Sequence, residues 1–442
     1  MPKADPSVPD GLYRPSLTEP IGQLSPQRWM QAPETRAVIA ALMADGVTVR
    51  FVGGCVRDSV QNRPISDIDI ATPDPPERVL ALLDDAGIRA IPTGLAHGTV
   101  TAVIGEAHFE ITTLRRDVAT DGRHASVVFT DDWVADAARR DFTFNAMSAD
   151  PQGRIYDPFN GLADLGAGRV CFVGNPVHRI EEDTLRLLRF FRFQAFYGRG
   201  AACDKSALAA CRQLAPRLVD LSGERVASEL LRLLGSDDPA TILLVMQGVG
   251  VLSVILPEGE DVTRLRQLAW LERRGLVRSD IHPDPLRRLA ALLGSDPVAA
   301  RSVTARLKLS GVARDRLVAM AAPDSEIAPG LDSAARRRIL RRLGSDLVRD
   351  LVLLAWARHR IGIVHADPVD TVGWIGLLDD AAAWVPVELP VKGRDLLALG
   401  APAGPEIGRV LARLDGWWEE RDYRPTRDEC LEAARRAVAG SL

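Results

Sequence analysis

Two aspartates, Asp67 and Asp69, lie two residues apart in a Ser-Asp-Ile-Asp-Ile segment, shortly after a Gly-Gly-Cys-Val-Arg-Asp segment at residues 53–58. Side chains alternate along a β-strand, so both carboxylates would share one face while the isoleucines take the other. Two anionic oxygen donors just after a glycine turn and an arginine are what a magnesium–triphosphate site needs. The pattern therefore indicates phosphoryl or nucleotidyl transfer.

A third carboxylate, Glu110, lies in another strand-like segment, on the face that it shares with Thr112. A single glutamate on a strand usually faces solvent and means little alone. Together with the aspartate pair it would complete three carboxylates that hold two Mg²⁺ ions about 3.5–4 Å apart, the spacing that in-line transfer requires. We therefore predict Asp67, Asp69 and Glu110 as catalytic residues, with the two aspartates as metal ligands.

The double glycine predicts a phosphate-binding turn. Gly53 and Gly54 would let backbone amides approach phosphates, and Arg57 on the first turn of the following helix would meet their charge. A tight strand-to-helix turn in which Arg57 pairs with Asp58 explains the same residues. The position of the turn favours phosphate binding, because the aspartate pair follows at a distance that brings both to one end of a small sheet.

The segment at residues 138–146 places Arg139, Arg140 and Asp141 beside an aromatic, strand-like run. Asp141 could accept a hydrogen bond from a ribose hydroxyl while one of the arginines reaches a phosphate. The pattern alone favours a simpler interpretation, a helix C-terminus at which arginines are stabilised by the helix dipole.

In the segment at residues 181–192, three acidic residues are followed by arginines at every third position. At helical spacing Asp183 and Arg186 are i,i+3 neighbours, and Arg189 and Arg192 extend the same face. A salt-bridged amphipathic helix is the simpler interpretation. However, cytosine and adenine both present an exocyclic amine next to a ring-nitrogen acceptor, so one carboxylate and one guanidinium can pair with either base. Such a pair would accept CTP and ATP and reject GTP and UTP without a nucleic-acid template.

The elements that must position these residues follow from residue patterns. We predict, in order, a strand at 47–52, a helix at 56–62, a strand with the aspartate pair, a helix at 76–86 and strands at 98–104 and 108–114 joined by a turn at 105–107. From about residue 180 onward strand signals nearly vanish. The sequence therefore predicts an α/β unit followed by an all-helical remainder.

Chain length, net charge and cysteine content limit the classes of protein to which this chain can belong. The 442 residues are too many for one core, and the net charge of −4 excludes a protein that coats nucleic acid by bulk charge. The five cysteines are odd in number and form no C-x-x-C pair, which favours a reduced, cytoplasmic protein without structural zinc. No apolar run reaches membrane-spanning length, so no membrane partner is expected.

The motifs, in this order, resemble the class II tRNA nucleotidyltransferases, the bacterial and eukaryotic CCA-adding enzymes and their poly(A) polymerase relatives. The resemblance extends from Val49 to the region around Gly404. It implies an α+β fold with an N-terminal nucleotidyltransferase head of polymerase-beta type, which contains a mixed sheet, followed by a helical neck, body and tail. It also implies template-independent addition of C, C and A to the 3′ end of tRNA from CTP and ATP, with Mg²⁺ as the cofactor.

The resemblance assigns roles to individual residues. It makes Asp67 and Asp69 the metal ligands and Glu110 the third catalytic carboxylate, and it gives residues 116–129 as the loop linked to the switch from C to A addition. The residues that it implies bind the nucleotide are Gly53, Gly54, Arg57, Arg140, Asp141, Asp183, Arg186 and Arg189.

The resemblance also divides the chain. The expected parts are a flexible N-terminal arm at residues 1–30, a catalytic head at 31–173, a neck with the base-recognition helix at 174–235, a body at 236–325 and a tRNA-binding tail at 326–442. The neck, body and tail would hold the acceptor arm and elbow of tRNA. The oligomeric state stays open, a monomer being one option.

Several alternatives stay open from the sequence. They are a partial enzyme that adds only CC or only A, a poly(A) polymerase, a tRNA-binding protein without catalysis and a small-molecule nucleotidyltransferase. The Gly-Leu-Ala-His-Gly-Thr segment at residues 94–99 has the CCA-like form rather than that of bacterial poly(A) polymerases. The intact carboxylates argue against a non-catalytic protein, because an unused cluster of like charges is costly.

Overall fold

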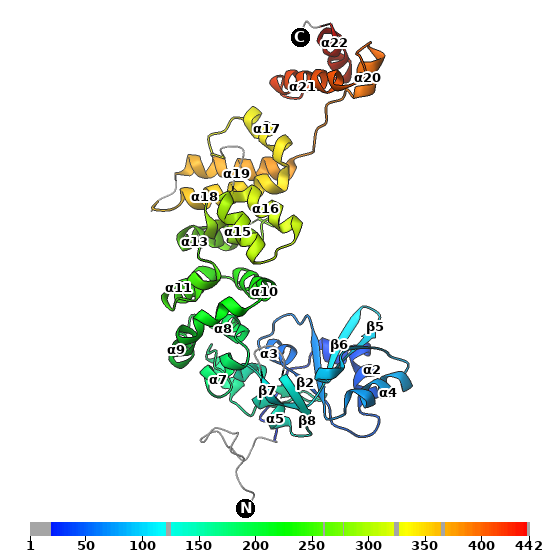
Figure 1. Ribbon diagram of the computed structural model, residues 1–442, viewed down its shortest axis with the longest axis vertical. Helices are drawn as coiled ribbons and strands as arrows, with labels where there is room; N and C mark the ends of the chain where they lie inside the picture. Colours follow the sequence, from blue (N-terminus) through cyan, green and yellow to red (C-terminus); the bar gives the residue numbers. More distant parts are fainter. Residues whose placement is uncertain are drawn as a thin grey trace, which may run out of the picture. The chain divides into compact units, whose positions relative to one another are not determined.

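The computed structural model describes residues 19–120, 125–259, 261–276, 278–321, 327–363 and 367–439, and it leaves out the side chains of residues 117–120 and 125–126. The chain divides into two compact units, Met1–Pro257 and Glu258–Leu442. Figure 1 shows strands in the first unit and helices in both. The prediction of a mixed-sheet head followed by a helical remainder is confirmed.

The first unit is built on a mixed sheet. Its strands, with a separate hairpin formed by β7 and β8, are β1 (Gly22–Gln23), β2 (Arg50–Val52), β3 (Ile68–Thr72), β4 (Arg89–Gly94), β5 (Thr99–Ile104), β6 (Ala107–Thr113), β7 (Arg115–Thr120), β8 (Ala125–Phe129), β9 (Ser148–Ala149) and β10 (Arg154–Tyr156). The strand order in the sheet is β1-β10-β9-β2-β3-β6-β5-β4. Among the described strands, β3 and β6 form the parallel pair, and the other neighbours are antiparallel.

Helices cover the sheet and continue beyond it to the end of the first unit. They are α1 (Arg28–Gln31), α2 (Pro33–Leu42), α3 (Gly54–Val60), α4 (Pro76–Asp85), α5 (Trp133–Ala138), α6 (Gly161–Gly166), α7 (Pro176–Glu182), α8 (Leu185–Tyr197), α9 (Lys205–Leu214), α10 (Gly223–Leu234), α11 (Pro239–Gly248) and α12 (Val251–Ile255). An aromatic cluster joins α8 to the sheet domain, since Phe193 packs edge-on against Phe142 and Phe144 with centroids 5.2 and 5.4 Å away. This packing fixes α8 beside the sheet.

Most of the predicted elements near the aspartates are confirmed. Helix α4 and strands β5 and β6 lie close to their predicted ranges, and Gly105 forms the turn between the strands with φ 59°. Helix α3 begins at Gly54, two residues before its predicted start. Strand β4 has no counterpart among the predictions, because Pro92 and its mostly exposed side chains obscure the alternating pattern.

Within the predicted N-terminal arm, residues 1–18 lie outside the described residues. Strand β1 pairs with β10, and α1 places Trp29 against Phe51 at a centroid distance of 4.7 Å. The segment from β1 to α1 is thus packed on the mixed sheet.

The second unit is helical. Its helices are α13 (Val262–Trp270), α14 (Pro285–Leu293), α15 (Pro297–Arg306), α16 (Gly311–Ala321), α17 (Ser333–Leu343), α18 (Ser345–His359), α19 (Pro368–Ala383), α20 (Gly393–Ala398), α21 (Pro405–Glu420) and α22 (Arg427–Val438), with a π-helical turn at Leu271–Gly275. Asp284, Asp296 and Asp367 each cap a helix that opens with proline. The Asp-Pro pairs begin helices because the carboxylate accepts from the first free amides and proline needs none.

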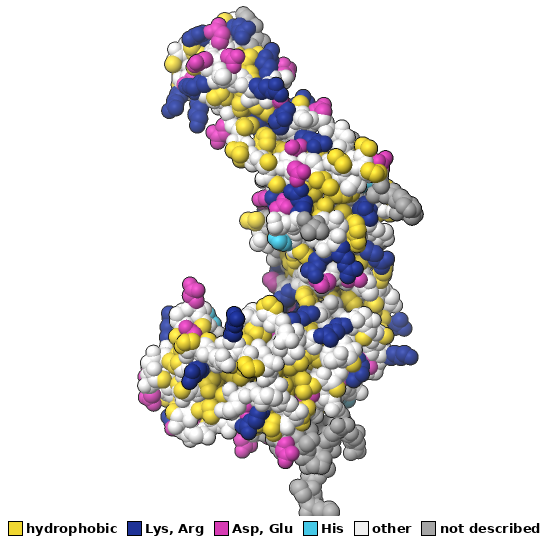
Figure 2. Space-filling view, turned by 180° about the vertical axis from the view of Figure 1, so that it is seen from behind, with side chains coloured by type: hydrophobic (Ala, Val, Ile, Leu, Met, Phe, Trp, Pro, Cys, Tyr) yellow, Lys and Arg dark blue, Asp and Glu magenta, His cyan; other side chains and the backbone are white. Residues whose placement is uncertain are grey.

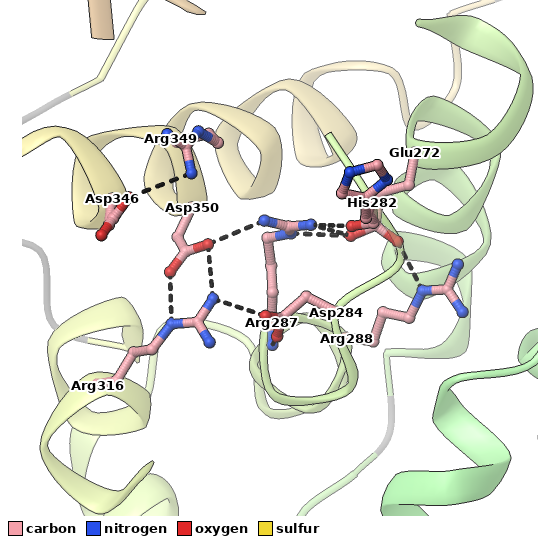
Figure 3. Close-up of polar contacts among 9 residues, drawn as sticks. All are labelled: Glu272, His282, Asp284, Arg287, Arg288, Arg316, Asp346, Arg349 and Asp350. Carbon is pink, nitrogen blue, oxygen red and sulfur yellow. Dashed lines mark hydrogen bonds and ion pairs between the residues drawn. The ribbon is translucent and has the colours of Figure 1, made fainter. Parts of the chain in front are cut away.

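A buried network of ion pairs ties four helical elements of the second unit together (Figure 3). Glu272, on the π-helical turn, accepts from Arg287 at 2.7 Å and from Arg288 at 2.6 Å. Arg287 also donates to Asp350 of α18 at 2.9 Å, and Asp350 accepts from Arg316 of α16 at 2.8 Å. Since the Arg288 and Glu272 side chains are fully buried, removing the Glu272 carboxylate would break the ion pairs of two buried arginines at once.

The surface carries charges of both signs. On the face shown in Figure 2, basic and acidic side chains are interspersed over both units. The five cysteines are free. No helix among the described residues is long and apolar enough to cross a bilayer.

Candidate active site

The described part of the first unit contains a pocket of about 860 Å³ where the sheet, the turn before α3 and helix α8 come together. Its lining includes the Gly53–Gly54 turn, both predicted metal ligands, eight arginines and five aspartates. Pockets for uncharged small molecules are lined mainly by apolar side chains. The dense charge here suits a polyanionic ligand that arrives with cations.

The predicted carboxylates come together at one point of the sheet. In the parallel pairing of β3 with β6, Asp69 and Glu110 stand directly opposite each other, although they are far apart in the sequence. Asp67 precedes the strand by one residue and accepts a hydrogen bond from Ser66 at 2.7 Å. Glu110 is exposed beside Asp69 and is not among the residues that line the pocket.

Asp69 has an unusual protonation equilibrium. Burial, reinforced by the negative charge of Glu110, raises its pKa to about 6, while Arg140 partly offsets the effect. A carboxylate that is buried beside other carboxylates and lacks a matching cation is stabilised when a divalent metal binds.

The donor set fits magnesium. Among the described residues, no group of three His, Cys, Asp or Glu side chains is arranged to hold a metal ion alone. Magnesium is typically held by one or two carboxylates together with substrate phosphates and water, so Asp67 and Asp69 meet its requirement only when a triphosphate is present.

The Gly53–Gly54 turn lies against the same carboxylate. Gly53 has φ 69°, and a Cβ atom added there would lie 3.4 Å from Nη1 of Arg140 and 3.6 Å from Oδ2 of Asp69. Arg57 forms the ion pair with Asp58, at 2.7 Å, and also donates to Oδ1 of Asn145 at 2.7 Å. The turn is therefore tight and lined with charge. Arg57 pairs with Asp58, as in the simpler interpretation, and it also lines the pocket, so its binding of phosphate stays a prediction.

Replacing Gly53 with alanine is expected to lower nucleotide binding about tenfold or more, because the methyl group strains a positive φ and fills space between Arg140 and the metal site. Gly46→Ala is the matched control, since Gly46 has φ 81° with nothing within 4 Å of the added atom. Both variants should lose about 1–2 kcal/mol of stability. Titration with CTP should separate them; equal affinities would exclude a role for the Gly53 turn in binding.

Arg140 and Asp141 lie in the pocket, but much of their hydrogen-bonding capacity is used within the protein. Arg140 donates to Asp136 of α5 at 3.0 Å, as expected for arginines at a helix C-terminus. Asp141 is buried and accepts from Asn145 at 2.9 Å and from Arg189 at 2.7 Å. Although burial opposes its charge, Arg189 and Asn145 hold the pKa of Asp141 below its usual value.

The prediction that Asp183 and Arg186 share one helix is wrong. Asp183 is extended, with φ −150°, between α7 and α8, and its carboxylate accepts a hydrogen bond from the amide of Leu185, the first residue of α8, at 3.1 Å. Both of its oxygens also accept from Arg225 of α10, at 2.9 and 3.0 Å. Arg186 is instead held by Glu182.

Both residues nevertheless line the pocket, together with Arg189. Arg186 also donates to the carbonyl of Arg139 at 3.0 Å, which links α8 to the segment that follows α5. The helix break therefore changes which partners hold the two side chains but leaves a carboxylate and a guanidinium facing the same cavity.

Several supporting residues were missed from the sequence. Asp136 binds both Arg139 and Arg140, and Asn145 joins Arg57 to Asp141. The spacing of Asp136 from the two arginines, three and four residues on a helix, is a signal that would have identified the first cluster. Asn145 carries no comparable local signal. Residues 121–124 of the predicted loop lie outside the described residues, and its flanks pair as β7 and β8.

Comparisons with known proteins agree with the family resemblance of the sequence motifs. Residues 49–171 match the family described as "Poly A polymerase head domain", and residues 202–262 match "Probable RNA and SrmB- binding site of polymerase A". A protein of Danio rerio named "CCA tRNA nucleotidyltransferase 1, mitochondrial" is 35% identical over 392 residues, which cover 87% of this chain and 86% of the relative. A "CCA-adding enzyme" of Streptococcus gordonii is 39% identical over 203 residues, or 46% of this chain and 49% of the relative.

A solved structure agrees with the sequence relatives. The crystal structure of the Bacillus stearothermophilus CCA-adding enzyme in complex with CTP superposes with a TM-score of 0.72 at 26% identity and covers 92% of this chain and all of that one. The fold, the ordered motifs and the extent of the Danio rerio match together lead to one conclusion: the chain belongs to the class II tRNA nucleotidyltransferase and poly(A) polymerase family.

Proposed function

We propose that this protein adds C, C and A to the 3′ end of tRNA, using CTP and ATP and releasing pyrophosphate. The observation that carries the proposal is the register of β3 and β6, which places Glu110 beside Asp69, while Asp69 lines the same pocket as Asp183 and Arg186. In the reaction, the terminal ribose oxygen bonds to the α-phosphorus, the bond to the β-phosphate oxygen breaks, and the hydroxyl proton leaves.

The carboxylates would hold Mg²⁺, which supplies charge stabilisation at the attacking and leaving oxygens. Asp67 and Asp69 would bind the ion, and Glu110 would complete the acidic edge that faces the terminal hydroxyl. The Gly53 and Gly54 amides with Arg57 would orient the triphosphate, which fixes the α-phosphorus for in-line attack.

Base selection would use Asp183 and Arg186. The carboxylate would accept from the exocyclic amine of cytosine or adenine, and the guanidinium would donate to the neighbouring ring nitrogen. Arg225 occupies both oxygens of Asp183, so one of these contacts must be shared or released when a base binds. Arg189, held by Asp141, would add charge on the same wall of the pocket.

The remaining parts of the chain would bind the acceptor. We assign residues 31–173 as head, 174–235 as neck, 236–325 as body and 326–442 as tail, with the helical parts holding the acceptor arm and elbow of tRNA. The match of residues 202–262 to a family described as a probable RNA-binding site supports RNA binding by the helical part of the chain. Free cysteines support a cytoplasmic location, although the Danio rerio relative is named as mitochondrial.

The test is to incubate the protein and Mg²⁺ with tRNAs that lack CCA, end in C or end in CC, and to supply CTP, ATP or both. A finished CCA end from every start is the expected result. Addition from one start only would identify a partial enzyme, and long adenosine tails would identify a poly(A) polymerase. No extension with intact tRNA binding would overturn the proposed reaction.

A further inference from the structure

We propose that Arg232 of α10 binds a phosphate group of a substrate in the pocket. This inference rests on the proposed function for the identity of the substrates. Arg232 lies outside every motif from which the site was predicted, yet its side chain lines the same pocket as Asp67 and Asp69.

The pocket arginines differ in how their charge is compensated. Six of the eight form an ion pair with a carboxylate: Arg57 with Asp58, Arg139 and Arg140 with Asp136, Arg186 with Glu182, Arg189 with Asp141 and Arg192 with Glu229. Arg115 donates to the His97 carbonyl. The side chain of Arg232, an exposed residue, has no hydrogen-bond or ion-pair partner within the described part of the chain. Its guanidinium is therefore available to a ligand.

Arg232 reaches the pocket from one face of α10. Arg225, Glu229 and Arg232 are spaced four and three residues apart, so they share a face of the helix. Arg225 binds Asp183 at 2.9 Å, and Glu229, which is buried, binds Arg192 of α8 at 2.5 Å. Two ion pairs thus hold the helix against the pocket and fix the direction of the third side chain.

The charge environment of Arg232 suits an anion. The pKa of Arg192 is lowered, mainly by burial, and the positive charges of Arg189 and Arg232 add to the effect while Glu229 opposes it. A guanidinium near other guanidinium groups gains from a phosphate, whose oxygens accept its paired N–H groups. Phosphate is present in both expected substrates, in the tRNA backbone and in the nucleoside triphosphate.

The test measures equilibrium binding by three variants. Arg232→Gln should raise the dissociation constant of its phosphate ligand about tenfold, and Arg232→Lys should raise it less. Arg212→Gln is the charge-matched control, because Arg212 is exposed in the same unit, does not line the pocket and only donates to the Gly248 carbonyl. The ligands are tRNA lacking CCA and, separately, CTP with Mg²⁺.

The two ligands separate the two sources of phosphate. Weaker tRNA binding by Arg232→Gln would show that Arg232 binds a phosphate of the RNA backbone. In that case the slope of log binding constant against log salt concentration should be smaller in magnitude by about 0.7 to 0.9. Weaker CTP binding with unchanged tRNA binding would assign the triphosphate. Unchanged affinity for both, in a variant with wild-type unfolding temperature, would overturn the proposal. Since these measurements need no turnover, a wild-type protein that fails to extend tRNA would count against the proposed function alone.

Discussion

Replacing Asp69 with asparagine is expected to lower nucleotide transfer roughly a thousandfold or more while making the metal-free protein more stable. The loss follows if Asp69 binds Mg²⁺ as proposed, because its charge would then support several kcal/mol of transition-state stabilisation. The gain follows because the raised pKa of Asp69, about 6, shows that its charged form is disfavoured in the folded chain. Single-turnover transfer and thermal unfolding measure the two effects.

The sign of the stability effect depends on pH. A carboxyl group with a pKa of about 6 in the folded state destabilises the protein fully above pH 6. This destabilisation decreases as the pH falls toward 4, which is near the pKa of the group in the unfolded chain. The variant should therefore be more stable than the wild type by about 3 kcal/mol at pH 8, and close to it in stability near pH 4. Magnesium affinity of the wild type should rise as pH increases through 6.

Asp45→Asn provides the control for Asp69→Asn. Asp45 is a half-exposed carboxylate in the same unit, paired with Arg78 and outside the pocket, so its loss should change neither transfer nor stability appreciably. If Asp69→Asn kept more than about a tenth of wild-type transfer, the assignment of Asp69 as a metal ligand would be wrong.

The largest stability effect is expected for Glu272→Gln in the second unit. Glu272 accepts from Arg287 and Arg288 in a buried network, and its neutral replacement leaves the Arg288 charge buried without its carboxylate (Figure 3). Breaking a buried pair in this way costs about 3–5 kcal/mol. Denaturant unfolding of the full chain should show the transition of the second unit moved to lower denaturant concentration.

Asp346→Asn is the matched control, because Asp346 forms an ion pair with Arg349 at 3.2 Å while its side chain is 89% exposed. An exposed pair contributes about 0–1 kcal/mol, so this variant should unfold almost like the wild type. Equal effects of the two variants would show that burial does not determine the strength of the network.

How much the sequence could predict depended on whether a residue acts through local or distant contacts. Asp67, Asp69 and the glycine turn lie within a short segment and line one pocket, as their spacing predicted, although Asp67 precedes β3 and is not part of the strand. Glu110 was placed on the correct strand face, but its pairing with Asp69 depends on two strands that are parallel neighbours only in the fold. A pattern within one strand does not fix its partner.

The segment predicted to recognise the base shows where local reasoning fails. Charges at helical spacing predicted one helix through Asp183, yet α7 ends at Glu182, and the Asp183 carboxylate accepts from the Leu185 amide and binds Arg225 of α10. An aspartate competes for backbone amides and is as suited to capping a helix as to extending one. The contact with Arg225 could not be predicted, because the position of α10 beside Asp183 depends on the tertiary fold.

The distribution of the pocket over the chain bears on how it forms during synthesis. Asp69 and Glu110 can meet only after β6 has been made and paired with β3 across the intervening α4, β4 and β5. The side of the pocket that contains Asp183 is completed later, when Arg225 and the rest of α10 have been synthesised. A nascent chain that ends before α10 would contain Asp69 and Glu110 but would lack the contact that orients Asp183. The proposed capacity to bind metal should therefore arise on the ribosome before the proposed capacity to select a base.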